Sequence, residues 1–195
     1  CYAPLIAGCT TIVYEGKPVG TPDAGAFWRV IAEHKVRAFF TAPTALRAIK
    51  RDDPEGHLVK DYDLTNLQAL YLAGERADPD TVHWAGRHLN VPVVDHWWQT
   101  ETGGHLITPL PGAVPTKPGS ATLPFFGVQP AVLDATTGVE ITTSPAEGVL
   151  VIKDSWPGQM RTLWGDHKRF EEAYFSQYPG YYFTGDGCRR DADGY

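Results

Sequence analysis

The sequence predicts an α/β fold, in which a largely parallel sheet with helices is followed by a small, mainly β region. Before Pro109, short apolar runs alternate with segments whose apolar residues recur at helical spacing, and this alternation favours a parallel sheet. Beyond Pro109, short β-type runs are separated by Gly and Pro. We therefore place an α/β subdomain at residues 1–108 and a mainly β subdomain at residues 109–195.

The first predicted elements follow from residue type and spacing. Thr10–Tyr14 is rich in β-branched and aromatic residues and ends at a Gly-Lys-Pro turn, which predicts a strand. The chain before it, Tyr2–Leu5, has a turn-and-strand pattern. Pro22 and Asp23 open a helix with apolar residues at spacings of three and four, and Val36–Phe40 follows as a strand.

The next units repeat this order of strand and helix. Thr41–Thr44 resembles a helix start, Leu67–Leu72 predicts a strand, about Pro79 to His88 a helix, and Val91–Val94 a short buried strand. Ligands of such sheets gather at the carboxyl ends of the strands. The residues that follow the two strands are therefore candidates for a binding site.

In the second region, two apolar runs and one helical segment are recognisable. Ala131–Asp134 and Gly148–Lys153 predict strands, and Asp166–Tyr174 has helical spacing. Asp193-Gly194-Tyr195 is typical of the beginning of a hairpin, so we expect the natural protein to continue past this point.

Composition limits the classes of function. With 195 residues, 43% hydrophobic and 12% aromatic, the chain is expected to be globular. A net charge of -6 gives no general electrostatic reason to bind nucleic acid, and the apolar runs are too short to cross a bilayer. We therefore expect no nucleic-acid or membrane partner, while the oligomeric state stays open.

The cysteines and the start of the chain bear on the compartment. Cys1, Cys9 and Cys188 are odd in number and lack the spacing of a zinc or redox motif, so we expect reduced thiols. This favours the cytoplasm, or the mitochondrial matrix of a eukaryote. Because the sequence lacks an initiating Met, the true amino terminus and any targeting signal are expected to lie upstream.

The most informative segment follows the strand that ends at Val94. Trp97 and Trp98 offer flat apolar faces, the hydroxyls of Thr100 and Thr102 are donors for phosphate oxygens, and the Glu101 carboxylate is a ligand for a hard cation such as Mg2+. The pattern predicts a site for a purine triphosphate.

This segment also carries a family resemblance. His96 to Gly103 resembles the signature loop of the acyl-adenylate-forming superfamily, and its Trp-Trp-Gln-Thr-Glu-Thr-Gly form looks like the short-chain acyl-CoA synthetases. Further segments resemble that family in order: Thr41–Ala45, Gly119–Thr122, Gly127–Pro130 and Tyr182–Gly187. The resemblance covers nearly all of the chain, which would be an internal fragment of the large domain.

The resemblance implies an activity and its cosubstrates. In that family a carboxylate reacts with ATP to give an acyl-adenylate and pyrophosphate, and the thiol of coenzyme A then attacks the adenylate. Thr100 and the loop backbone would hold the phosphates, while Glu101 would hold the Mg2+ that neutralises the leaving pyrophosphate. These two residues are the catalytic candidates.

Further nucleotide contacts are implied in three segments. Gly74, Glu75 and Arg76 resemble the segment that contacts adenine. Asp186 resembles the carboxylate that accepts hydrogen bonds from both ribose hydroxyls. The remaining nucleotide-binding candidates are Asp95, His96, Trp97, Trp98, Gln99 and Thr100.

The resemblance also suggests the size of the acyl group. Trp98 looks like the indole floor of a short acyl pocket, and Ala73 occupies a wall position that carries Val in acetate-specific relatives. The smaller side chain would admit about one more methylene, worth about 1 to 3 kcal/mol of discrimination. Together with Arg76, which matches the Ala-Gly-Glu-Arg form of propionyl-CoA synthetases, this favours propionate as substrate.

Two family elements do not match any part of the chain. The phosphate loop is expected before Cys1, and the mobile C-terminal domain with its catalytic lysine after Tyr195, so we expect this chain alone to be inactive. Acetate-CoA ligase is the alternative enzyme. A non-catalytic adenylate-binding module and a Trp-rich carbohydrate-binding protein are alternatives of other classes, although the second leaves the ordered motifs unexplained.

Overall fold

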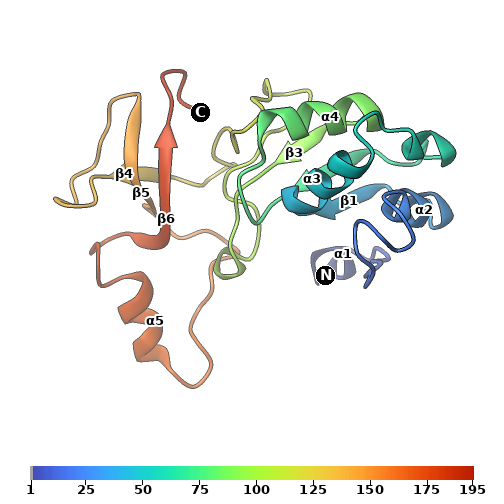
Figure 1. Ribbon diagram of the computed structural model, residues 1–195. Helices are drawn as coiled ribbons and strands as arrows, with labels where there is room; N and C mark the ends of the chain where they lie inside the picture. The colour runs from blue at the N-terminus through green and yellow to red at the C-terminus, as the bar shows by residue number, and fades with distance from the viewer. Residues whose placement is uncertain (1) are drawn as a thin grey trace.

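The computed structural model describes residues 2–195, which form two separate three-stranded sheets joined by long loops (Figure 1). The first sheet is parallel, in the order β1-β2-β3, and the second is antiparallel, in the order β4-β5-β6. The predicted fold class, a parallel sheet with helices followed by a mainly β region, is confirmed.

The parallel sheet consists of short strands connected by helices. Its strands are β1 (Ala38–Thr41), β2 (Ala69–Leu72) and β3 (Val93–Asp95). The helices α2 (Ala26–Glu33), α3 (Pro43–Asp52) and α4 (Pro79–Leu89) alternate with them along the chain, and a short helical turn, η1 (Leu58–Asp61), follows α3.

One face of this sheet forms the main core. Leu70 and Leu72 of β2 and Leu46 and Ile49 of α3 are completely buried there. Trp84 of α4 packs in the same core, and its indole nitrogen donates to the carbonyl of Pro54 at 2.7 Å. The helices are therefore fixed on this face, and the opposite face carries the alternate residues of each strand.

The ends of α4 follow from the sequence. Asp78 precedes the helix and its side chain accepts a hydrogen bond from the Thr81 N–H at 2.8 Å, with Pro79 in the first turn. Asn90 ends the helix in the left-handed conformation, with φ of 52°.

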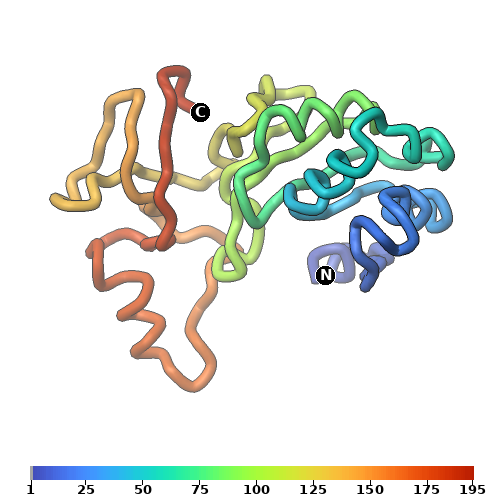
Figure 2. Tube along the Cα trace, viewed as in Figure 1, coloured from blue at the N-terminus to red at the C-terminus, as the bar shows by residue number. Residues whose placement is uncertain are grey.

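The antiparallel sheet consists of β4 (Pro130–Leu133), β5 (Ala146–Ile152) and β6 (Tyr182–Arg190). Helix α5 (His167–Tyr174) lies beyond one end of this sheet and contacts β6 (Figure 1). The segment after β3 runs between the two sheets, as the tube in Figure 2 shows. This segment contains the helical turn η2 (Thr100–Thr102) of the predicted signature loop.

Three predictions near the amino terminus were wrong. Thr10–Tyr14 is not a strand, because it pairs with no strand among residues 2–195 and its residues are largely exposed. Tyr2–Leu5 belongs to a short helix, α1 (Tyr2–Ile6), instead of a turn and strand. Helix α2 begins at Ala26 and not at Pro22, because the Asp23 carboxylate accepts the Gly25 N–H at 2.8 Å and holds the preceding residues in a turn.

The structure of the carboxyl-terminal part also differs from the prediction. The nine residues of β6 were not predicted as a strand, since Gly185 and Gly187 lower β propensity locally. Asp191–Tyr195 forms the expected tight turn, in which the Gly194 N–H donates to the Asp191 carbonyl at 3.1 Å. Cys9 and Cys188 are free thiols, whereas Cys1 lies outside the described residues. Within residues 2–195, no helix has the length and apolar character needed to span a membrane.

Replacement of the central core residue of β2 tests this packing. Leu70→Ala removes a completely buried side chain, so we expect the free energy of unfolding to fall by about 2 to 5 kcal/mol. Urea unfolding of the complete protein, followed by circular dichroism, measures the loss. The control is Leu5→Ala, whose side chain is 55% exposed; equal effects of the two substitutions would contradict this core.

Candidate nucleotide site

Two of the predicted segments leave the parallel sheet at the same edge. Leu72 pairs with Asp95 in the ladder between β2 and β3, and the His96 N–H donates to the Leu72 carbonyl at 3.1 Å. Ala73 and His96 therefore follow neighbouring strand ends. This is the carboxyl edge of the sheet, where ligands of α/β proteins bind.

Glu75 is held at this edge by the start of α3. Its carboxylate accepts the Thr44 N–H at 2.8 Å and the Thr44 hydroxyl, and Arg47 lies 2.8 Å from its second oxygen. The hydrogen bond from the Thr44 hydroxyl is the main cause that lowers the pKa of Glu75. Gly74 before it has a φ of 98°, which favours glycine, and no atom lies within 4 Å of where a Cβ would stand.

Arg76 turns toward the loop that contains Gly119. Its Nε donates to the Gly119 carbonyl at 3.2 Å, so its side chain connects the end of β2 with one of the family-like segments. The predicted adenine-contacting segment, residues 74–76, is thus bonded to two different parts of the chain.

Asp95 is a buried carboxylate at the end of β3. Burial raises its pKa from 3.8 to about 6, and the backbone N–H of Ala77 and the charge of Arg76 oppose this rise. Only 8% of the residue is exposed. Its charge near neutral pH is therefore poorly solvated.

His96 is buried beside three rings. Its Nδ1 donates to the Val94 carbonyl at 3.2 Å, since the carbonyl only accepts, and its ring centroid lies 4.0 Å from that of His105 and 5.4 Å from that of Phe40. Burial, with a smaller contribution from His105, lowers the pKa of His96 to about 4. The imidazole is therefore neutral at neutral pH.

The two threonines of the signature loop differ in solvent exposure. Thr100 is exposed, as a phosphate-binding hydroxyl must be. Thr102 is completely buried, and its hydroxyl accepts the Gln99 N–H at 2.9 Å and lies 2.8 Å from the Gly104 carbonyl. The expectation that Thr102 also donates to phosphate is wrong, because this hydroxyl stabilises the turn.

A second loop fixes the backbone of the signature loop. The Trp156 indole nitrogen donates to the Thr102 carbonyl at 2.8 Å, and the Met160 N–H to the Glu101 carbonyl at 3.3 Å. Gly103 has a φ of 69°, and a Cβ there would lie 2.3 Å from the carbonyl oxygen of Gly158. The two backbones therefore touch where no side chain fits.

Glu101 has one oxygen bonded and one available. The Tyr174 hydroxyl donates to Oε1 at 3.2 Å, and the Tyr174 ring stacks on Tyr182 with centroids 5.6 Å apart. Among residues 2–195, no hydrogen bond or ion pair engages Oε2. Burial, followed by the charge of Glu101, raises the pKa of Tyr174, so its hydroxyl stays a donor.

These groups fit a cation that also binds a phosphate. Mg2+ in nucleotide sites is held by one or two carboxylates together with phosphate oxygens and water. The described residues contain no group of three or more His, Cys, Asp or Glu that could enclose a metal ion. The one available carboxylate oxygen of Glu101, preceded in the sequence by the exposed Thr100, therefore suits a Mg2+ ion that phosphate oxygens and water also bind.

Asp186 on β6 lies against the signature loop. Its Oδ2 accepts the Gln99 Nε2 at 2.8 Å and the Trp97 Nε1 at 3.1 Å. Its own N–H donates to the Thr184 hydroxyl at 3.1 Å. The structure thus brings together Asp186 and a loop that is more than 80 residues earlier in the sequence.

The two predicted acyl-pocket residues differ in exposure. Ala73 is buried, whereas 38% of Trp98 is exposed and its ring lies edge to face with Phe40, with centroids 6.3 Å apart. Phe40 therefore contacts both His96 and Trp98.

Sequence reasoning missed the supporting residues of this site. Tyr174, Trp156, Thr44 and Arg47 bond to the predicted residues from other segments. Tyr174 showed only helical spacing, and Trp156 lies in a loop without a motif, so neither carried a sequence signal.

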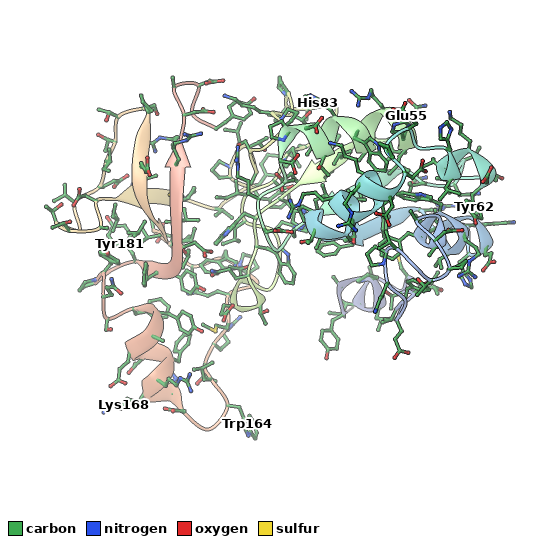
Figure 3. All side chains as sticks on the ribbon, viewed as in Figure 1. Glu55, Tyr62, His83, Trp164, Lys168 and Tyr181 are labelled. Atoms are coloured by element: carbon green, nitrogen blue, oxygen red, sulfur yellow. The ribbon has the colours of Figure 1, made fainter. Side chains whose placement is uncertain are left out.

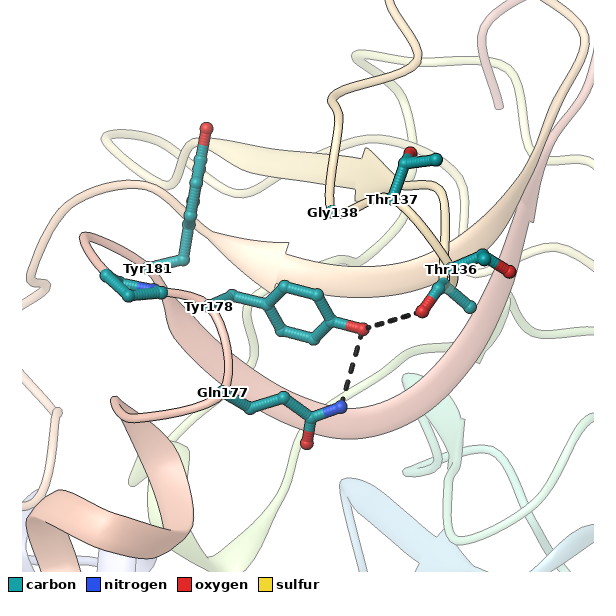
Figure 4. A pocket seen from close by; sticks show the side chains of 8 residues that line it. Thr136, Thr137, Gly138, Gln177, Tyr178 and Tyr181 are labelled. Carbon is teal, nitrogen blue, oxygen red and sulfur yellow. Dashed lines mark hydrogen bonds between the residues drawn. The ribbon is translucent and has the colours of Figure 1, made fainter.

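Two other surface features lie apart from these residues. A shallow pocket at the end of β4 is lined by Thr136, Gly138, Gln177 and Tyr178, and the Gln177 amide donates to the Tyr178 hydroxyl at 3.4 Å (Figure 4). It shares no residue with the predicted site. Trp164, labelled in Figure 3, is fully exposed in the loop before α5.

Known proteins resemble the chain along its whole length. A model of the AMP-binding enzyme family matches residues 1–164. Acetyl-coenzyme A synthetase of Rhodobacter capsulatus is 59% identical over 197 residues, which cover 100% of this chain and 30% of the relative. The proteins of the same name from Beijerinckia indica and Bdellovibrio bacteriovorus are each 56% identical, with the same shares. The chain thus spans 30% of the length of these relatives.

The raised pKa of Asp95 predicts a pH-dependent stability difference. Because the folded state holds this proton up to about pH 6 and the unfolded state loses it near pH 3.8, the carboxylate destabilises the fold increasingly as pH rises through that window. Asp95→Asn should therefore gain stability relative to the wild type between about pH 4 and pH 6, by up to about 2 to 3 kcal/mol, and keep it above pH 6.

Urea unfolding of both complete proteins across that pH range measures the difference. Asp154→Asn, at an exposed carboxylate bonded to Gln129, is the control and should give no such pH-dependent gain. A flat difference for Asp95→Asn would show that its pKa is not raised.

Proposed function

The chain belongs to the AMP-binding enzyme family, and from this membership we propose that the complete protein joins a short-chain carboxylate to coenzyme A in an ATP-dependent, AMP-forming reaction. The carboxylate first displaces pyrophosphate from ATP to give an acyl-adenylate, and the coenzyme A thiol then displaces AMP. The observation that supports this most directly is the contact between the signature loop and Asp186. It supports a ribose-binding role for Asp186 beside the proposed phosphate and cation ligands, Thr100 and Glu101.

We assign the nucleotide to the carboxyl edge of the parallel sheet. The backbone at Gly74-Glu75-Arg76 and the Trp97 ring would border the adenine, and Asp186 would accept from the ribose. Asp95 and His96 lie at the base of this edge, and their burial supports a positioning role instead of proton transfer. Thr100, exposed at the start of η2, would donate to a phosphate oxygen.

Glu101 is the proposed ligand of Mg2+. The cation would neutralise charge on the triphosphate and on the departing pyrophosphate. Tyr174 restrains one carboxylate oxygen, while the backbone bond from Met160 fixes the residue that carries it. The protein's contribution is therefore a preoriented carboxylate, which needs little rearrangement when the nucleotide arrives.

For the acyl substrate we infer acetate in preference to propionate. The relatives are all named acetyl-coenzyme A synthetase, which favours acetate. The argument for propionate depended on space beside Ala73. However, Ala73 is itself buried directly after β2, with 6% of the residue exposed.

The remaining proposals concern partners and compartment. Small molecules, namely the carboxylate, ATP and coenzyme A, are the proposed partners, and we propose no nucleic-acid or membrane partner. The bacterial relatives favour the cytoplasm.

Pyrophosphate release by the complete protein tests the function. With ATP and Mg2+ present, acetate should give the highest kcat/KM, propionate a lower one and butyrate the lowest. Subsequent addition of coenzyme A should yield the acyl-CoA. ATP binding without pyrophosphate release for any of the three acids would favour a non-catalytic adenylate-binding protein.

Replacement of the proposed metal ligand is the second test. Glu101→Gln keeps the shape but removes the charge, so pyrophosphate release should fall by roughly a hundredfold or more, most strongly at limiting Mg2+. Glu147→Gln, an exposed residue of β5, is the control and should retain wild-type rates. An unchanged Mg2+ dependence of the Glu101→Gln protein would remove Glu101 from the metal site.

Replacement of the acyl-pocket residues tests substrate size. Trp98→Gly removes the exposed indole and should raise the ratio of kcat/KM for butyrate over acetate, whereas Ala73→Val should lower the ratio for propionate over acetate, each by roughly tenfold. The exposed Trp164→Gly is the control for loss of an indole. If neither ratio moves, the acyl group binds elsewhere.

A further inference from the structure

The side chain of Gln99 is bonded to β6 through all of its polar atoms. Its Nε2 donates to the Thr184 carbonyl at 2.7 Å and to Asp186 Oδ2 at 2.8 Å, and its Oε1 accepts from the Tyr182 hydroxyl at 3.0 Å. An amide has two donor hydrogens, and both are used. Gln99 therefore has no free donor to offer a nucleotide, although the sequence placed it among the nucleotide ligands.

The same hydrogen bonds determine which carboxylate oxygen of Asp186 is available to a ligand. Oδ2 accepts from two neutral donors, Gln99 and Trp97, whereas no hydrogen bond among residues 2–195 engages Oδ1. The backbone of Asp186 is fixed as well, because its N–H donates to the Thr184 hydroxyl, which in turn donates to the Leu150 carbonyl at 2.8 Å. The carboxylate thus presents one oxygen in a defined direction.

We propose that Gln99 is a positioning residue, which acts through Asp186 to select nucleotides with a complete ribose. This inference rests on the proposed function, in which Asp186 accepts hydrogen bonds from the ribose hydroxyls. Gln99 holds Oδ2 so that Oδ1 meets the ribose as the principal acceptor. Without the bond from Gln99, the Asp186 carboxylate can rotate. A nucleotide with both ribose hydroxyls then no longer binds better in the transition state than one that lacks a hydroxyl.

The residue type fits this role. Glutamate would place a second carboxylate against Oδ2 and repel it, while asparagine is one methylene shorter and would not span the gap from the loop to β6. Glutamine provides the two neutral donors that the Thr184 carbonyl and Asp186 require, and its oxygen accepts from Tyr182. These contacts join residues 85 and 87 positions apart in the sequence.

A comparison of ATP with 2′-deoxy-ATP and 3′-deoxy-ATP tests the proposal in the complete protein. The quantity measured is the ratio of kcat/KM for ATP to that for each deoxynucleotide, from acetate-dependent pyrophosphate release. We expect the wild type to prefer ATP over at least one of them by roughly tenfold or more, and Gln99→Leu to bring that ratio close to one. Asp186→Asn should weaken the preference in the same way.

The control variant loses the same kind of bond elsewhere. Gln129 donates its Nε2 to Asp154 at 3.0 Å on the exposed surface, so Gln129→Leu should keep both the rate and the nucleotide preference. Circular dichroism and the unfolding midpoint establish that each variant is folded. Should Gln99→Leu not fold, Gln99→Glu retains the length of the side chain, and the same loss of preference is expected from it.

The outcomes distinguish the positioning role of Gln99 from the ribose-binding role of Asp186. If Asp186→Asn loses the preference but the folded Gln99 variant keeps it, and loses rate equally with all three nucleotides, Gln99 only stabilises the loop and the positioning role is overturned. If the wild type already shows no preference, the ribose role of Asp186 fails, and the inference fails with it. Loss of the preference in both variants, with Gln129→Leu unchanged, supports the proposal.

Discussion

The pairing of Leu72 with Asp95 is the constraint on which the site depends. It ends two parallel strands at one edge, so that residues 73–76 and 95–101, which are separate in the sequence, leave the sheet side by side. Because side chains alternate between faces, a slip of one residue would turn His96 toward the helices and Asp95 toward the aromatic rings. Val93 of β3, the ladder partner of Leu70, packs against the core, and the slip would remove it from this position.

Within the signature loop, neighbouring residues have opposite tasks. Thr102 is buried and completes the turn, and Gln99 reaches across to β6, whereas the Thr100 hydroxyl and one oxygen of Glu101 carry no hydrogen bond within residues 2–195. Bonded and available polar groups thus alternate within four consecutive residues, 99–102. This division explains why residue type alone overstated the number of ligand contacts, since a threonine hydroxyl serves a turn as well as it serves a phosphate.

The sequence predicted the parallel sheet and the family to which the chain belongs, because strong apolar periodicity and long motifs depend on local residues. The sequence did not predict β6, because its glycines lower the β propensity and the strand forms by pairing with β5. It also did not predict the hydrogen bonds of Tyr174 and Trp156, which depend on how distant loops are placed. Thr10–Tyr14 shows the reverse case, in which β propensity without a partner strand gives no strand.

The contact between Gly103 and Gly158 limits which substitutions the two loops can accept during evolution. A side chain at position 103 would meet the carbonyl oxygen of Gly158 at 2.3 Å, and one at position 158 would meet the Thr102 carbonyl at 2.8 Å. Because each obstacle is backbone, a second substitution in the facing loop cannot relieve the first. The two positions are therefore coupled: as long as the loops cross at this point, neither one accepts a side chain.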